Sequence, residues 1–169
     1  MSSRRVVVIG IGTGNPEHMT VQAINALNRL DAVLIPRKGE TKADLAELRR
    51  EICRLYLTNP KTRIVEFDLP VRDAARPDYA SGVEDWHTAI AQRYAQLFAA
   101  EPEGAAIGLL VWGDPSLYDS TLRILERVAT VAFETEIIPG VTSMQALAAS
   151  HGIALNGIGK PFTVTTGRK

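Results

Sequence analysis

The sequence lacks the features that several protein classes require. One cysteine, Cys53, leaves no internal disulfide possible, which excludes a short disulfide-built scaffold. Neither sign of charge is in excess, because 19 basic and 19 acidic residues give a formal net charge of zero. The basic surplus typical of nucleic-acid-binding proteins is therefore absent. No apolar run reaches the roughly 18 residues of a membrane-spanning helix. We therefore expect neither a nucleic-acid nor a membrane partner.

The composition that remains is that of an ordinary globular protein. The chain has 169 residues, of which 46% are hydrophobic and 22% charged, so it is long enough to build a substantial core. The first residues lead into a valine run without the hydrophobic core of a signal peptide, which predicts a cytoplasmic location. His18, His87, His151 and Cys53 show no metal-ligand spacing, and we expect no metal.

Short apolar runs alternate with segments of helical period along residues 1–153. Strands that are continuously apolar are typical of parallel sheets covered on both faces, and their connections are right-handed crossovers. The sequence therefore predicts an α/β fold: a doubly wound, mainly parallel five-stranded sheet flanked by helices. The predicted strands are residues 6–9, 32–35, 63–68, 106–111 and 132–138.

Capping residues mark where the helices are expected to begin. The predicted caps are Thr20, Thr41 with Asp44 three residues later, Asp114 before Pro115, and Thr142 or Ser143. Apolar stripes at helical spacing follow each cap or precede the next strand. Trp86, Tyr94 and Phe98 lie at helical spacing and are expected in the core or an interface. Arg49, Arg50 and Arg54 are expected on the exposed face of the second helix. Their charges there would be offset by Glu47 and Glu51.

Three glycine-containing turns are predicted at the edge of the sheet where ligands of α/β proteins bind, beyond the carboxyl ends of the strands. They are residues 10–14, 113–118 and 139–143. The first turn is a poor dinucleotide fingerprint, because Asn15 stands where the third glycine belongs and the second strand ends in Pro36 rather than an acid. No Gly-Lys-Ser/Thr sequence closes it as a P-loop. The sequence thus favours a cofactor without phosphate.

These turns resemble the signature loops of a known family. Read in order, the motifs are GIGTGNPEHMT at residues 10–20, WGDPSLYD at residues 112–119 and IPGVTS at residues 138–143, each directly after its predicted strand. Together they are similar to those of the tetrapyrrole methylases, enzymes with two α/β domains and a cofactor cleft between them. The resemblance extends over nearly the whole chain but only over the first domain of the family.

The resemblance implies S-adenosyl-L-methionine as the cofactor. Carried over by motif position, the cofactor-binding residues are Thr13, Trp112, Gly113, Asp114, Leu117, Thr142 and Ser143. The chain departs from the family at Thr13, where many members have proline, and at Pro36, where the uroporphyrinogen methylases have an acid. Their acid–base assignment therefore does not transfer to this chain.

Within the family, the chain is most similar to members that methylate precorrin-5 and release an acetyl group as acetate. The motifs concerned run through residues 37–45 and 159–168. An anionic tetrapyrrole substrate needs a local basic patch, for which Arg37, Lys38 and Lys42 are the candidates. Deacetylation needs a base or a polarising donor; its residue is left open, with Asp44 and Asp114 as weak candidates. A homodimer is also expected.

The last residues are expected to begin a second domain. Residues 154–161, with Gly157, Gly159 and Pro161, resemble a linker, and residues 162–166 resemble one more strand without a partner. The expected division is therefore 1–153 for the first α/β domain and 154–169 for the linker and first strand of a second, largely absent domain. Three alternatives stay open: another tetrapyrrole methylase, a non-catalytic cofactor-binding half, and a seven-stranded Rossmann-like methyltransferase.

Overall fold

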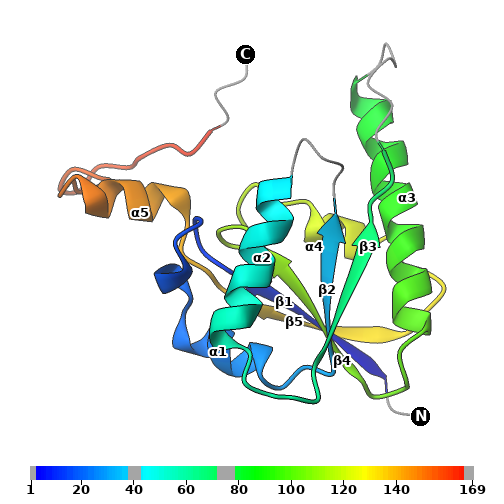
Figure 1. The fold of residues 1–169 in the computed structure, drawn as a ribbon. Coiled ribbons are helices and arrows are strands. Elements are labelled where there is room, and N and C mark those ends of the chain that lie inside the picture. The colour runs from blue at the N-terminus through cyan, green and yellow to red at the C-terminus, as the bar shows by residue number, and fades with distance from the viewer. Residues whose placement is uncertain (1–2, 38–42, 72–78, 166–169) are drawn as a thin grey trace.

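Five parallel strands form the centre of the protein. The structure, a computed structural model, describes residues 3–37, 43–71 and 79–165, without the side chains of residues 43–44 and 79–81. Its strands are β1 (Arg4–Gly10), β2 (Ala32–Arg37), β3 (Arg63–Asp68), β4 (Ala106–Val111) and β5 (Phe133–Ile138). They pair in the order β3-β2-β4-β1-β5, every pair parallel (Figure 1). The predicted sheet is confirmed, and it is wholly parallel.

Burial follows position in the sheet. All six residues of β4 and the last five of β1 are buried, because these central strands are covered on both faces. The edge strands β3 and β5 each bury one residue, Phe67 and Ile138. The continuous apolar runs of the sequence therefore identify the strands in the middle of the sheet.

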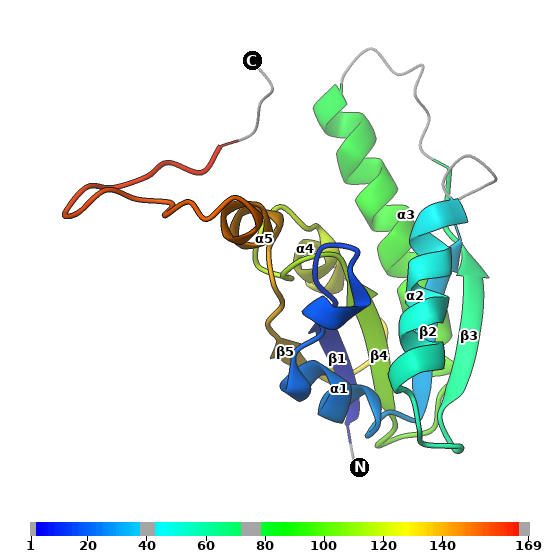
Figure 2. The same ribbon diagram turned by 60° about the vertical axis from the view of Figure 1, so that its left-hand side comes forward.

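Helices cover the sheet from both sides. Helices α1 (Val21–Leu27) and α2 (Ala43–Tyr56) pack on one face, and α3 (Tyr79–Ala99) and α4 (Thr121–Leu125) pack on the other (Figures 1 and 2). A hydrophobic core lies on each face of the sheet, and alternate residues of one strand point into the two cores. Ile9 packs with the first pair of helices and Val8 with the second. The expected core positions Tyr94 and Phe98 lie in the second core.

The helix predicted from Asp114 and Pro115 was placed too early. Helix α4 begins at Thr121, because the chain first makes a turn in which the Asp114 carboxylate accepts the backbone N–H of Ser116 at 2.8 Å. Tyr118 then adopts a left-handed backbone with φ 55°, which no α-helix accommodates. By contrast, the cap at Thr20 is confirmed, since its hydroxyl accepts the backbone N–H of Ala23 at 3.0 Å.

Helix α5 (Ser143–Ser150) leads away from the sheet. Its predicted cap is confirmed: Thr142 forms a reciprocal capping box with Gln145. None of its residues is buried, and residues 151–165 continue as an exposed segment that extends outward in both views (Figures 1 and 2). Residues 162–165, where a strand was predicted, are not in a strand, because none of the described strands runs beside that segment; Thr166 lies outside the described residues, and the division into two domains stays a prediction.

Across the part of the chain that is described, no helix is both long and apolar enough to span a bilayer.

Candidate functional site

The strand order brings the three expected loops together. Strands β4, β1 and β5 are neighbours, so the β4 loop (residues 112–120), the β1 loop (residues 11–20) and the β5 loop (residues 139–142) leave the sheet side by side. All three begin at its carboxyl edge, since the strands are parallel. Residues up to about 130 positions apart in the chain thereby share one surface.

The β1 and β4 loops are joined backbone to backbone. Gly113 donates its N–H to the carbonyl of Gly12 at 2.7 Å, and Gly12 returns a longer bond to the carbonyl of Gly113 at 3.4 Å. This isolated antiparallel bridge lies just beyond the end of the parallel ladder. Both residues have positive φ, 78° for Gly12 and 61° for Gly113, a conformation that glycine adopts without steric cost.

The β5 loop closes against the same point. A methyl group built on Gly140 would lie 2.0 Å from the carbonyl oxygen of Gly113, and one built on Gly10 would lie 2.6 Å from the nitrogen of Gly140. Neither separation is compatible with van der Waals contact. The three loops therefore approach as closely as they do only because these positions carry no side chain.

Asp114 holds the β4 and β5 loops together. One carboxylate oxygen accepts the N–H and the hydroxyl of Ser116, and the other accepts the N–H of Gly140 at 2.9 Å. Burial opposes ionisation of this carboxyl, but the hydrogen bonds from Ser116 and Gly140 outweigh it and lower the pKa of Asp114. With both oxygens occupied, the carboxylate is suited to positioning these loops, and it has little capacity left to act as a base.

Trp112 packs across the loop pair. A methyl group built on Gly14 would meet the indole ring at 3.2 Å, so the ring lies directly against the β1 loop. Its Nε1 is buried and has no hydrogen-bond partner among the described residues. A buried donor without an acceptor costs about 1–3 kcal/mol, a penalty that structural residues usually avoid and functional sites often carry.

A groove opens beside these loops, between the β1 loop and α5. Its volume is about 450 Å³, and it is lined by Thr13, Ser143, Met144, Ala146, Leu147 and Ser150. The Thr13 hydroxyl is fixed by a 2.7 Å hydrogen bond with Nδ1 of His18. Thr142 does not line the groove; it is the N-cap residue of α5, and its hydroxyl is engaged with Gln145 at 2.9 Å. Of the predicted cofactor residues, Leu117 stays half-buried within the β4 loop, where its N–H bonds the carbonyl of Asp114.

The predicted basic patch is only partly visible. Arg37 forms a two-pronged ion pair with Asp68, with both N···O distances 3.0 Å, so much of its charge is already compensated. Lys38 and Lys42 lie outside the described residues, as does the side chain of Asp44. Among described residues, no group of three or more His, Cys, Asp or Glu side chains is arranged to hold a metal.

Arg49 is not on the exposed face of α2, where it was expected. Its Nε donates to the carbonyl of Leu110 at 2.8 Å and its Nη1 to the carbonyl of Leu45 at 2.9 Å, which draws the guanidinium under the end of β4. Arg50 and Arg54 do lie outward, paired with Glu47 and Glu51. The helical spacing could have predicted this inward position, because Arg49 falls on the same face of the helix as Leu45 and Ile52.

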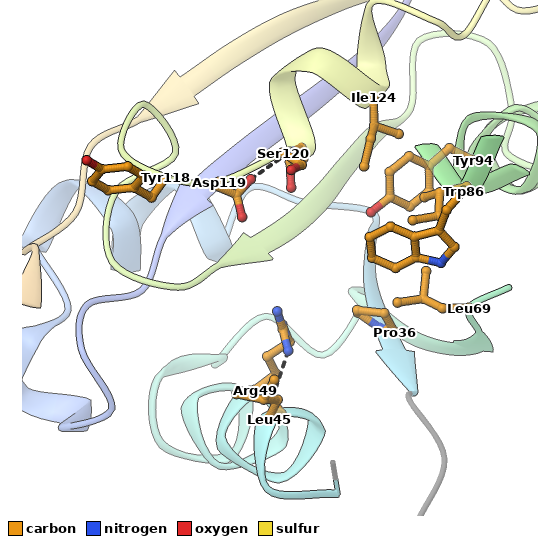
Figure 3. Close-up of a pocket in the computed structure, with 12 residues that line it drawn as sticks. Pro36, Leu45, Arg49, Leu69, Trp86, Tyr94, Tyr118, Asp119, Ser120 and Ile124 are labelled. Atoms are coloured by element: carbon orange, nitrogen blue, oxygen red, sulfur yellow. Dashed lines mark hydrogen bonds between the residues drawn. The ribbon is translucent and has the colours of Figure 1, made fainter. Parts of the chain in front are cut away.

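Arg49 lines a second pocket at the same edge of the sheet. The pocket has a volume of about 230 Å³ and lies between α2, α3 and the β4 loop (Figure 3). Its lining includes the polar residues Arg49, Tyr94, Tyr118, Asp119, Ser120 and Thr121 and the apolar residues Trp86 and Ile90. Asp119 is the last residue of the motif at residues 112–119, but no role was predicted for it, since nothing in the sequence shows that its side chain faces Arg49 and Tyr94.

Comparison with known proteins identifies the fold and the loops. The family profile of the tetrapyrrole (corrin/porphyrin) methylases matches residues 5–169. The chain belongs to this family. The resemblance drawn from the three motifs is thereby confirmed, and the Rossmann-like alternative is excluded.

Two curated relatives show where in the family the chain lies. It is 55% identical to the precorrin-6A synthase [deacetylating] of Sinorhizobium sp. over 98% of this chain and 65% of that protein. It is 31% identical to the precorrin-2 C(20)-methyltransferase of the same source over 89% of this chain and 59% of that protein. The chain thus spans less than two thirds of the length of each relative.

Solved structures agree with the fold. A cobalamin-synthesis-related protein (CobF) of Corynebacterium diphtheriae superposes with a TM-score of 0.75 at 38% identity, over 95% of this chain and 63% of that one. The uroporphyrin-III C-methyltransferase of Thermus thermophilus, solved with S-adenyl homocysteine, gives a TM-score of 0.52 at 23% identity, over 90% of this chain and 53% of that one. The second likeness shows the shared fold alone.

The glycine contact between the loops makes one substitution costly. Gly140→Ala forces a methyl group against the carbonyl of Gly113, and we expect it to lower the free energy of unfolding by about 1–3 kcal/mol, as overpacking does. Gly157→Ala is the matched control, because its new methyl group would lie no closer than 3.8 Å to Lys160. Urea unfolding of both variants measures the difference, and equal stability would show that the loops are not packed as described.

The loop role of Asp114 predicts a pH-dependent variant. Its folded pKa lies below its ordinary value of 3.8, so its ionised form stabilises the fold above that pH and the contribution is lost as pH falls through the folded pKa. Asp114→Asn should cost about 1–3 kcal/mol at neutral pH, because an amide cannot accept from both sides. The cost should shrink below about pH 4.

Urea unfolding across this pH range is the measurement for Asp114→Asn. The exposed Glu126→Gln provides the control for removal of one acidic charge. A stability loss in Asp114→Asn that stays constant down to pH 2.5, which is about one pH unit below the ordinary pKa of an aspartate, would contradict the assignment.

Proposed function

We propose that the full-length protein is an S-adenosyl-L-methionine-dependent C-methyltransferase of cobalamin biosynthesis that methylates precorrin-5 and releases acetate. The observation that carries this proposal is the 55% identity to a precorrin-6A synthase [deacetylating], which runs over 98% of this chain and so through all three loops. The fold and the convergence of the loops support it, because they supply a ligand site at the carboxyl edge of the sheet.

The groove beside the loops fits the proposed cofactor. A volume of about 450 Å³ falls within the roughly 300–1,000 Å³ of small-molecule sites. Its lining combines hydroxyl groups with the apolar Met144 and Leu147, which suits a ligand that has both polar and apolar parts. We propose that Thr13, Trp112, Gly113, Asp114, Leu117, Thr142 and Ser143 hold S-adenosyl-L-methionine.

The bound cofactor supplies a methyl group attached to a sulfonium, and the neutral thioether formed when the methyl is transferred is a good leaving group. What the chain contributes is position. The glycine contacts fix three loops against one another, and the ionised Asp114 adds hydrogen bonds between two of them. Alignment of two reactants in one site is worth about 7–11 kcal/mol in favourable cases. A rigid edge of the sheet is therefore more important here than an acid or a base.

Release of the acetyl group makes a different demand. It requires a water molecule together with a base or a donor that polarises the carbonyl. Asp114 is committed to Ser116 and Gly140, so we propose that it positions the loops. Asp44 remains a weak candidate for the base. For the substrate carboxylates, Arg37, Lys38 and Lys42 remain candidates, with Arg37 sharing its charge with Asp68.

We also propose that residues 154–169 lead into a second domain that covers α5 and the segment after it. Support comes from the exposed apolar side chains there, which include Leu147 (63% exposed), Ile158 (104%) and Phe162 (50%). Soluble domains rarely leave such a series uncovered. The full-length enzyme is proposed to be cytoplasmic and to form a homodimer. Light scattering of the purified protein tests the homodimer.

Two alternatives remain. The 31% identity to a precorrin-2 C(20)-methyltransferase favours another tetrapyrrole as substrate. A cofactor-binding half that does not catalyse the reaction on its own is the second alternative, and methyl transfer by the 169-residue chain in a single-turnover assay would exclude it.

Mass spectrometry and calorimetry together test the proposed function. Full-length protein incubated with precorrin-5 and S-adenosyl-L-methionine should give a product with one methyl added and one acetyl lost. S-adenosylhomocysteine should bind the full-length protein at least about tenfold more tightly, about 1.4 kcal/mol, than it binds the 169-residue chain, because a second domain would add contacts. Methylation of precorrin-2 instead would favour the first alternative, and absence of both binding and turnover would overturn the proposal.

A further inference from the structure

Arg49 places a guanidinium cation in this pocket, and the described residues hydrogen-bonded to it do not compensate its charge. Among the described residues, the guanidinium of Arg49 donates to two acceptors, the carbonyls of Leu110 and Leu45, whereas a guanidinium carries five N–H donors. Burial lowers the pKa of Arg49, so the surrounding structure resists its charge. Both of these hydrogen-bond acceptors are backbone carbonyls rather than carboxylates. Several donors therefore remain available toward the pocket.

Two other polar groups face the same space. Tyr94 is 6% exposed, yet its hydroxyl has no hydrogen bond among the described residues. Asp119 accepts the N–H of Thr121 through one carboxylate oxygen at 2.6 Å, and the side chain lies across the pocket from Arg49 (Figure 3). Arg49, Tyr94 and Asp119 also interact electrostatically with one another. Two donors and one acceptor thus converge.

The ionisation states suit this division of roles. Burial is the largest cause that raises the pKa of Tyr94, to about 12, and the charge of Asp119 adds to it. The phenol therefore keeps its proton at neutral pH and is a donor. Arg49 is a donor in any case. Asp119 is the remaining acceptor, and its second oxygen is available for a water molecule.

Size and position define what enters the pocket. A volume of about 230 Å³ is smaller than the roughly 300–1,000 Å³ of sites for whole small molecules, so it admits a substituent and a water rather than a macrocycle. Tyr118, Asp119 and Ser120 of its lining belong to the same β4 loop as Gly113 and Asp114. A substituent in this pocket is therefore carried by a substrate that lies along the methyl-transfer loops.

We propose that this pocket is the deacetylation site, in which Arg49 and Tyr94 bind the carbonyl oxygen of the acetyl substituent and Asp119 accepts a proton from the attacking water. The proposal rests on the proposed function, because it assigns the acetyl-releasing half of that reaction. It also separates the two halves in space, with methyl transfer at the glycine loops and hydrolysis between α2, α3 and the β4 loop.

The chemistry balances with water as the co-reactant. The water oxygen bonds to the acetyl carbonyl carbon, while one of its protons passes to Asp119. The bond from that carbon to the macrocycle then breaks, and its electron pair remains in the macrocycle, which uses it to attack the methyl group. Acetate and two protons leave for one methyl gained. Arg49 and Tyr94 stabilise the oxyanion, a role worth about 10²–10³ in rate for each donor.

Three substitutions in the full-length protein test the pocket. Tyr94→Phe, Arg49→Gln and Asp119→Asn should each lower the rate of acetate release by about 10²-fold. The control is Arg50→Gln, the next residue on the helix, whose guanidinium pairs outward with Glu47 and Glu66. Its rate should stay within about twofold of wild type, because exposed pairs contribute little. In ¹⁸O-labelled water, the released acetate should carry one labelled oxygen.

Binding of S-adenosylhomocysteine distinguishes failure of the pocket assignment from failure of the proposed function. All four variants should bind it as the wild type does, because none of these residues lines the groove beside the glycine loops. Wild-type rates of acetate release in folded Tyr94→Phe and Asp119→Asn, or acetate without solvent oxygen, would overturn the pocket assignment alone. A wild-type protein that neither binds the cofactor product nor releases acetate would overturn the proposed function and this inference with it.

If Arg49→Gln fails to fold, Tyr94→Phe decides the result. Phenylalanine keeps the ring, which packs against Phe67 and Phe98 with centroids at 5.9 and 5.7 Å, and removes only the hydroxyl.

Discussion

The close approach of three backbones at Gly10, Gly113 and Gly140 is the contact on which the rest of the site depends. It exists because β4, β1 and β5 are adjacent and parallel, so that their loops leave the sheet at one edge. A side chain at Gly140 would occupy the space of the Gly113 carbonyl, and one at Gly10 would meet Gly140. The hydrogen bond from Gly140 to Asp114 joins two of these loops, and the groove between the β1 loop and α5 lies beside them.

A rigid edge of this kind suits a reaction that depends on alignment. Methyl transfer from a sulfonium needs the reacting atoms in line and asks little of the protein as an acid or a base. Release of an acetyl group asks for polarising donors and a proton acceptor. The fold offers these two environments side by side: glycine loops with an occupied carboxylate, and a pocket lined by the side chains of Arg49, Tyr94 and Asp119.

The sequence predicted the sheet well because its central strands are buried on both faces and appear as unbroken apolar runs. It predicted the caps at Thr20 and Thr142, where short polar side chains bond local backbone. It failed where long-range contacts decide. Arg49 turns toward the carbonyl of Leu110, 61 residues away, and Asp114, besides its local turn with Ser116, accepts a hydrogen bond from Gly140, 26 residues away. The strand expected at 162–165 needs a neighbour that the described chain does not provide.

The central claim is that the three glycine loops form one binding surface, and an NMR titration tests it most directly. In full-length protein labelled with ¹⁵N-glycine, S-adenosylhomocysteine should shift the amide signals of Gly12, Gly14, Gly113 and Gly140 together, as one saturable event. The amides of Gly104 and Gly108 lie elsewhere in the sheet region and should not move. Shifts at only one of the three loops, or shifts at Gly104 without the loop glycines, would contradict the account.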